Sequence, residues 1–263
     1  NVTGVPRADG ALPKLIGAGH SRHFLVSNGA VLTIKHLHLY NGIRTSTPCG
    51  DGNDYSGCFG GSVYVTGDNS KLVAVKCLFA GNTAFYGGSI MAYSGSAAVI
   101  LRKTNITNSS CSNYGGGVGL YSGTTSEMTD TRLENNVAEG FGGGAYVRGA
   151  SLVMTRGIVI GNKQGDQNGA SRGGGGLYLE YRSVVRIRES YIMENVGIRG
   201  HQIMTYKHAT DDTIKPLITF INTLFKSEFD IGNFYGFHDG ASNERLYVGT
   251  QSCTTAPAQC QDN

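Results

Sequence analysis

Residues 79–90 read FAGNTAFYGGSI, and looser copies of this stretch return along the chain. Paired glycines followed by a short apolar run occur five times, and a weaker sixth copy lacks the glycines: residues 60–65, 87–92, 116–120, 143–147, 175–179 and 202–205. The first apolar positions of these copies are 27, 28, 27, 32 and 26 residues apart. Self-similarity at a nearly fixed period indicates a repeat architecture, in which each copy is one structural unit.

Two further elements keep the same period. An apolar residue stands three places before an asparagine in Phe79–Asn82, Leu133–Asn136, Val159–Asn162 and Ile192–Asn195, with a variant from Asn105 to Asn108. Apolar runs also recur at Leu72–Cys77, Ala98–Leu101, Leu152–Thr155, Val184–Ile187 and Leu217–Ile221. All these runs are too short for helices and are punctuated by glycine, so they predict strands.

Strands that recur once per turn can stack in parallel, and stacked coils bury an apolar column that one coil cannot bury alone. The repeat therefore predicts an all-β chain, a single-stranded right-handed parallel β-helix of about seven to eight coils. Paired glycines suit a tight corner, where φ is positive or another backbone passes close. The repeated asparagine predicts a ladder of stacked amides. A β-sandwich is the alternative, but its hairpins would return every ~8–12 residues.

The repeat divides the chain into two regions. We expect the β-helix to occupy residues 1–226, with clear repeats over 60–205. Residues 163–172 lengthen one coil and account for the 32-residue spacing. Residues 227–263 are expected to form a C-terminal cap or tail, since open coils expose strand edges that need cover.

Alternation within the copies predicts which side chains face outward. Valines and leucines at alternate positions point into the helix, which turns the residues between them outward. This places a stripe of aromatic and methionine side chains on one face, at Tyr64, Met91, Tyr146 and Tyr178, and we predict that it forms a binding surface or interface. Ordinary cross-strand packing, or cover from a loop, is the alternative for these residues.

Composition excludes several classes of protein. Glycine accounts for 40 of 263 residues but proline for only 5, which does not fit collagen. The 40% hydrophobic and 16% charged fractions suffice for a core and do not indicate disorder. A formal net charge of +3 does not suggest nucleic acid as a partner, and no apolar run is long enough to predict a membrane span.

Six cysteines permit three disulfides, and two pairs are close in sequence. We expect the disulfides Cys49–Cys58 and Cys253–Cys260, with Cys77–Cys111 as the remaining pair. Disulfides would place the protein in an oxidising setting, either secreted or on the cell surface. The alternative is six unlinked buried thiols. No spacing of cysteine and histidine suggests zinc.

The stretch at residues 79–90 closely resembles the "FxxN … GGAI" repeat of chlamydial polymorphic outer membrane proteins, and Leu133–Asn136 followed by residues 143–145 is a looser copy. The resemblance covers about residues 60–205. It implies a surface-exposed β-helix associated with adhesion and self-association. It is specific for architecture and carries little information about activity.

Parallel β-helices also host polysaccharide lyases and hydrolases, so a catalytic set has to be considered. Asp211 and Asp212 are the only adjacent acidic pair, and the pair resembles one piece of the polygalacturonase pattern. Lys207 and His201 lie nearby and would supply a base in a lyase. The His-containing and Arg-Lys motifs of that enzyme class are missing, so a solvated loop is the favoured interpretation.

Two weaker motifs concern calcium and glycans. Asp51, Asn53 and Asp54 place oxygen ligands at short spacing, but the downstream bidentate glutamate of a calcium loop is absent, so we expect no cofactor and keep calcium as the alternative. Sequons begin at Asn1, Asn105 and Asn108, about the number that chance would give. Asn1 and Asn105 are the expected glycosylation candidates, because Asn108 falls in the predicted asparagine ladder.

These features favour a non-enzymatic, extracellular or cell-surface structural or adhesive protein. Its expected partners are further copies of itself or other surface proteins, because contacts that do not close generate filaments or layers. A polysaccharide-degrading lyase or hydrolase, and a carbohydrate-binding module that uses the tyrosine stripe, are the alternatives.

Overall fold

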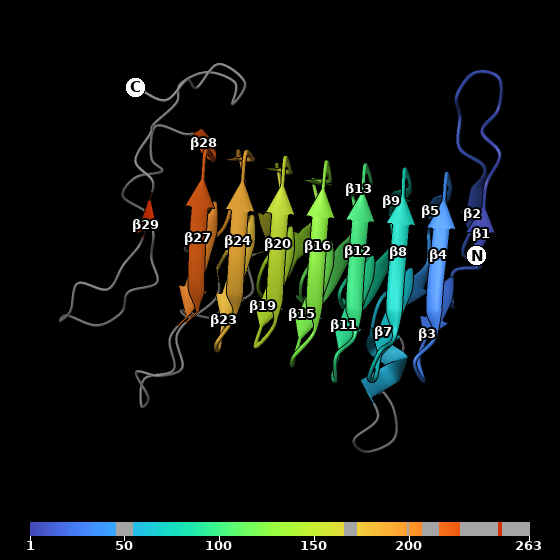
Figure 1. The fold of residues 1–263 in the computed structure, drawn as a ribbon, viewed down its shortest axis with the longest axis horizontal. Helices are drawn as coiled ribbons and strands as arrows, with labels where there is room; N and C mark the ends of the chain where they lie inside the picture. The colour runs from blue at the N-terminus through green and yellow to red at the C-terminus, as the bar shows by residue number, and fades with distance from the viewer. Residues whose placement is uncertain (46–54, 166–172, 199, 207–215, 227–246, 249–263) are drawn as a thin grey trace.

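The computed structural model describes the chain except for residues 46–54, 166–172, 199, 207–215, 227–246 and 249–263. Short strands stand side by side along the long axis and follow one another from the N-terminal end to β27 and β28 (Figure 1). They form four sheets in which the paired strands run parallel, so the predicted parallel β-helix is confirmed. The only helix among the described residues is a 3-10 turn at Tyr55–Cys58.

Two of the sheets, A and B, form neighbouring walls of the solenoid. Sheet A contains β1 (Val2–Thr3), β4 (Val31–Lys35), β8 (Lys71–Val75), β12 (Ala98–Arg102), β16 (Thr125–Thr129), β20 (Ser151–Thr155), β24 (Val184–Arg188), β27 (Leu217–Ile221) and β29 (Tyr247–Val248). Sheet B contains β2 (Lys14–Ile16), β5 (His38–Tyr40), β9 (Leu78–Ala80), β13 (Asn105–Thr107), β17 (Arg132–Glu134), β21 (Ile158–Ile160), β25 (Tyr191–Met193) and β28 (Leu224–Lys226). The eight strands of sheet B agree with the predicted seven to eight coils.

The other two sheets, C and D, carry the glycine corner between them. Sheet C contains β3 (Phe24–Val26), β7 (Val63–Thr66), β11 (Ile90–Tyr93), β15 (Val118–Tyr121), β19 (Ala145–Arg148), β23 (Leu177–Glu180) and β26 (Ile203–Tyr206). Sheet D contains β6 (Ile43–Arg44), β10 (Thr83–Tyr86), β14 (Ser110–Tyr114), β18 (Val137–Ala138) and β22 (Lys163–Gln164). Sheet D has no counterpart among the elements that the sequence predicts.

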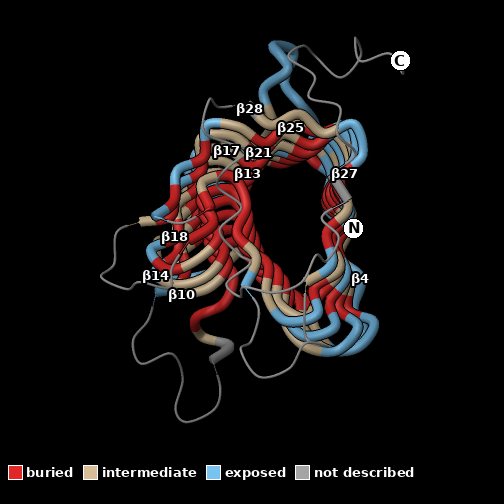
Figure 2. Tube along the Cα trace, turned by 90° about the vertical axis from the view of Figure 1, so that its left-hand side faces the viewer, coloured by how far each residue is buried: buried red, intermediate tan, exposed pale blue. Residues whose placement is uncertain are grey.

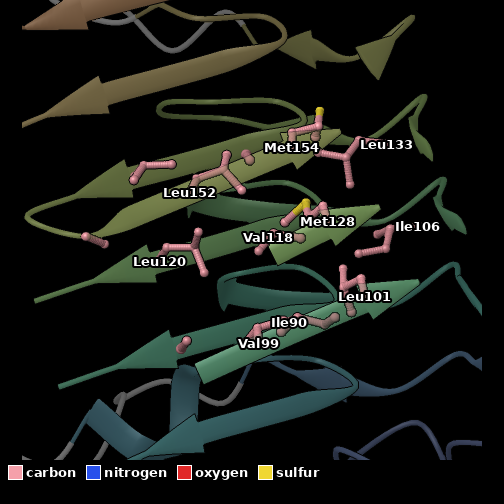
Figure 3. Packing of buried hydrophobic residues seen from close by; sticks show 14 of the residues in the cluster. Ile90, Val99, Leu101, Ile106, Val118, Leu120, Met128, Leu133, Leu152 and Met154 are labelled. Atoms are coloured by element: carbon pink, nitrogen blue, oxygen red, sulfur yellow. The ribbon is translucent and has the colours of Figure 1, made fainter. Parts of the chain in front are cut away.

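Alternate side chains fill the interior, as the pattern predicts. Inward residues of successive coils stack in register, for example Val63 beneath Ile90 and Ile90 beneath Val118. They form one continuous buried cluster, part of which Figure 3 shows around Val99 and Leu101. Burial of these apolar side chains makes the main contribution to the stability of the fold, because each coil covers the inner apolar face of its neighbours.

The two tasks expected of the paired glycines fall on different residues. The first has positive φ, between 58° and 73° at Gly60, Gly87, Gly115, Gly142, Gly174 and Gly200. The second lies against the next coil: a Cβ on Gly88 would stand 2.0 Å from the carbonyl oxygen of Gly116. In the later coils the positive φ falls one residue before the pair taken from the sequence.

The asparagine ladder is present, with one correction. The Oδ1 atom of Asn162 accepts from the backbone N–H of Asn136 at 2.9 Å, and that of Asn195 accepts from the N–H of Asn162 at 2.9 Å. The coil that contains β13 uses Ser109 rather than Asn108, because the inward residue there is Ile106. Asn108 is exposed and has a φ of 51°, so its predicted place in the ladder is wrong by one residue.

The chain turns between sheets A and B at residues whose type does not predict a corner. One residue per coil adopts φ between 47° and 52°, and none of them is glycine: His36, Lys76, Lys103, Asp130, Arg156, Glu189 and Asn222. Side-chain sterics disfavour this conformation by about 1–2 kcal/mol per residue. The N–H of each of the first six bonds to a carbonyl of the next coil, as Lys76 does to Arg102 at 2.9 Å, and these bonds hold the corner in place.

Candidate functional site

The predicted stripe of Tyr64, Met91, Tyr146 and Tyr178 points away from the interior of the helix but does not reach solvent. Tyr146 is 1% exposed and Tyr178 2%, and Tyr64 and Met91 are also buried. The expectation of an exposed binding stripe is therefore wrong. These side chains form clusters separate from the main core, so the orientation predicted by the alternation is nevertheless confirmed.

A second layer of aromatic rings covers the stripe. Phe59, Tyr86, Tyr114 and Phe141 each lie just before a glycine corner, where the chain passes over the outer face of sheet C. The ring of Tyr146 stacks on Tyr114 with centroids 4.8 Å apart and on Tyr178 with centroids 5.6 Å apart. Stacked and edge-to-face rings at these distances stabilise beyond their buried area. The alternative of ordinary packing is therefore the correct one.

A polar network borders this aromatic layer. The hydroxyl of Tyr146 donates to Oε2 of Glu180 at 2.6 Å, and Nη1 of Arg148 donates to the hydroxyl of Tyr121 at 2.6 Å. Burial, with the nearby Glu180 carboxylate as a second cause, raises the pKa of Tyr146 far above its usual value. The phenol therefore stays protonated and acts as a hydrogen-bond donor, which does not fit a phenolate general base.

The catalytic and calcium candidates receive little support from the described residues. Asp211, Asp212 and Lys207 lie outside them, as do Asp51, Asn53 and Asp54. His201 is half-buried, and its Nδ1 accepts a bond from the N–H of Gly197 at 3.3 Å, as a loop residue does. Within the described ranges no group of three His, Cys, Asp or Glu side chains could hold a metal ion.

One of the three predicted disulfides is wrong. Cys77 and Cys111 are both free and buried. Cys77 lies between β8 and β9, whereas Cys111 lies in β14 of sheet D and pairs with Ala84 and Ala138, so the two occupy different positions of the coil. Cys58 is buried and disulfide-bonded, and Cys49 lies outside the described residues, so their pairing stays a prediction. Cys253 and Cys260 also lie outside.

The asparagines of all three sequons are exposed. Asn1 begins the chain, Asn105 opens β13 with an outward side chain, and Asn108 occupies the corner that follows β13. The expectation that Asn108 would be hidden in the ladder is therefore wrong. Glycosylation at any of them stays a prediction.

Exposed large apolar side chains gather toward both ends of the solenoid. Between Tyr40 and Tyr181 no described residue belongs to this class, whereas six precede Tyr40 and five follow Tyr181. Toward the first coil they include Ile16 of β2, 62% exposed, and Leu25 of β3, 59% exposed. β2 and β3 are terminal strands of their sheets. Toward the other end, Leu217 and Ile221 lie on the outward face of β27, which is not terminal because β29 pairs with it.

Comparisons with known proteins leave the fold and these surfaces as the basis for function. No family model, no curated protein and no solved structure gives a significant match to this chain. The resemblance to the chlamydial repeat family therefore stays a prediction carried by the motif at residues 79–90. None of the described helical segments is long and apolar enough to cross a membrane.

Proposed function

We propose that this protein is a non-enzymatic extracellular structural protein whose solenoids associate end to end. The distribution of exposed apolar side chains carries the proposal: they gather toward both ends, and the described middle coils have none. Apolar side chains on terminal strands favour association, because strand addition to β2 and β3 would satisfy backbone groups and bury Ile16 and Leu25.

End-to-end association follows from the polarity of a parallel solenoid. The strands within each sheet are parallel and the coils stack in chain order, so the two ends of the solenoid differ. A contact between unlike ends is therefore heterologous. Such a contact repeats without closing and would produce a filament or a surface layer. Extracellular location and adhesion belong to the same proposal and rest on the two disulfides that stay predicted, Cys49–Cys58 and Cys253–Cys260, and on the family resemblance.

Sedimentation velocity over a concentration series tests the proposal. The wild-type protein should form a ladder of oligomers, and Ile16→Lys/Leu25→Lys should shift it to monomer. Val153→Lys, which places a charge on the outer face of β20 midway along the solenoid, is the matched control and should still associate. Wild-type protein that stays monomeric at its highest soluble concentration would contradict the proposal.

A mixing experiment distinguishes the kind of contact. Leu217→Lys/Ile221→Lys places charges toward the second end, so each double variant alone should be monomeric. An equimolar mixture should form a heterodimer, because each variant keeps one intact end. If the mixture stays monomeric, or if the variant at Leu217 and Ile221 associates as a dimer through its N-terminal ends, unlike-end association is wrong.

A further inference from the structure

The corner between sheets A and B carries an unbalanced column of positive charge over three successive coils. Lys35 and Arg102 occupy the last positions of β4 and β12, two strands apart, since both pair with Val75 of β8. Lys76 and Lys103 are the corner residues that follow β8 and β12, and His36 precedes them in the same column. These five residues are called the basic corner below.

Four of the five side chains of the basic corner are exposed to solvent. Lys35, Lys76, Arg102 and Lys103 are exposed, and none has an ion pair within the described part of the chain. The exposed corner is visible between β27 and β25 on the end-on view (Figure 2). Four permanent cations at these two neighbouring positions exceed the formal net charge of the whole chain, which is +3.

The same corner is electrically balanced farther along the solenoid. In the next three coils the corner position holds Asp130, Arg156 and Glu189, and the strand position before it holds Thr129, Thr155 and Arg188, so two acidic and two basic residues balance. Nε of Arg156 lies 2.7 Å from Oδ1 of Asp130. Arg156 also lies 3.9 Å from Glu189. The imbalance therefore belongs to the first coils. Glu127 of β16 and Asp130 are the acidic residues nearest to them in the strand register.

The backbone holds these cations at regular intervals. The N–H of His36, Lys76 and Lys103 bonds to Val75, Arg102 and Thr129 of the next coil at 3.1, 2.9 and 2.9 Å. Corner positions of successive coils are therefore about 4.8 Å apart, the separation of hydrogen-bonded strands. Little backbone entropy would be lost on binding, because the array is already fixed.

We propose that the basic corner binds an acidic polysaccharide that lies along the solenoid axis. A linear polymer with pendant sulfate or carboxylate groups complements a narrow band of cations, two residues wide, on an exposed edge. Recognition of nucleic acid generally adds aromatic platforms for bases or an element that enters a groove, and the basic corner has neither. This inference goes beyond the proposed self-association and does not depend on it, because a monomer carries the whole basic corner.

Binding to immobilised polysaccharides at several salt concentrations tests the proposal. The probes are heparin for sulfate groups, polygalacturonate for carboxylate groups, dextran as the neutral polymer, and duplex DNA. Wild-type protein should bind heparin or polygalacturonate with an affinity that falls steeply with salt, and should not bind dextran. The stronger of the two acidic arms identifies the anionic group.

Lys76→Gln/Arg102→Gln/Lys103→Gln should weaken that binding by about tenfold or more, because each lost cation removes a screened ionic contact. Lys163→Gln/Arg182→Gln/Arg186→Gln changes the net charge equally, at exposed positions away from the basic corner, and should stay within about threefold of wild type. Circular dichroism would verify that both triple variants fold. Equal weakening by both, no binding to either acidic polymer, or equal or tighter binding to DNA would each overturn the proposal.

Discussion

At the scale of single residues, the tightest constraint is the second glycine of each corner. A Cβ on Gly88 would meet the carbonyl oxygens of Gly116 and Ser110 at 2.0 and 2.6 Å. Both oxygens belong to the backbone of the next coil, which hydrogen bonds hold in register. No side-chain rotation can relieve the clash, so the substituted coil would have to separate from its neighbour.

We therefore expect Gly88→Ala to lower the free energy of unfolding by about 3 kcal/mol or more, the range of overpacking in a rigid site. Gly165→Ala is the matched control, because its Cβ would lie 3.4 Å from the nearest atom and its φ is not positive. Urea unfolding followed by circular dichroism would measure both variants. Similar losses would show that helix stability does not depend on this close approach.

A second prediction concerns the buried asparagine ladder. Asn162 is fully buried, and its Nδ2 donates to the carbonyl of Leu133 and to Oδ1 of Asn195, each at 2.9 Å. Asn162→Ala would leave the N–H of Asn136 without its acceptor, and an unsatisfied buried group costs about 1–3 kcal/mol. Asn162→Ser should lose less, because Ser109 already occupies this slot in another coil. Equal losses in urea unfolding would contradict this account.

The two free cysteines give a third prediction. Burial raises the pKa of Cys111, and of Cys77, above the usual value of a thiol, so both should resist alkylation in the folded protein. Iodoacetamide should label both thiols only after the protein is unfolded. The labelling should need no reductant, because neither thiol is in a disulfide. Peptide mass mapping reads out each site. A disulfide between these residues, or rapid labelling of the native protein, would contradict the structure.

At the scale of elements, strands were predictable where apolar alternation was clear, as at Leu72–Cys77, which overlaps β8. Sheet D was missed because some of its strands are only two residues long, as β18 is, and others are polar, as in the SCSNY of β14. The corner between sheets A and B was missed because Lys76 and Arg156 have no preference for positive φ; bonds between coils impose it. The burial of the stripe was not predictable from the sequence either. It depends on aromatic rings that the glycine corner places over the outer face of sheet C.

The first coils contain two histidines whose titration should affect stability. Burial lowers the pKa of His23 and of His38, and the charge of Lys14 contributes at His38. Such a group binds fewer protons in the folded state than in the unfolded state. Its contribution to the free energy of unfolding is present above the pKa of the unfolded state, about 6.5. The contribution is lost as the pH falls through the pKa of the folded state.

Urea midpoints measured downward from neutral pH should therefore fall as the medium acidifies. His23→Gln/His38→Gln should flatten this dependence, because it removes both titrating rings. His20→Gln is the control, since His20 is exposed, and it should leave the slope as in wild type. An unchanged slope in the double variant would contradict the assignment of the pH dependence to these side chains.

At the scale of the whole molecule, the surfaces that we propose for function arise from the register of the coils rather than from local motifs. Lys35, Lys76 and Arg102 are far apart in sequence and meet only because successive coils stack. The apolar ends are also a property of the assembled solenoid. The sequence predicted the stacking but not which outward positions would be covered, because cover depends on the second layer of chain over sheet C.

Stacking by nearest neighbours predicts that one whole coil can be removed. Deletion of residues 137–162 joins Asn136 to Lys163, and the ladder spacing from Asn136 to Asn162 is 26 residues, so every remaining strand keeps its place. Leu177 would then stack on Val118, and Asn195 would follow Asn136 in the ladder. The shortened protein should give the circular dichroism spectrum of a β protein and a lower free energy of unfolding, because one interface between coils is lost.

Deletion of residues 137–149 is the control. It removes half a coil and displaces inward side chains from the core, so the variant should not form a folded state that unfolds cooperatively. Loss of folding in both deletions would show that stability depends on longer-range contacts than those between adjacent coils.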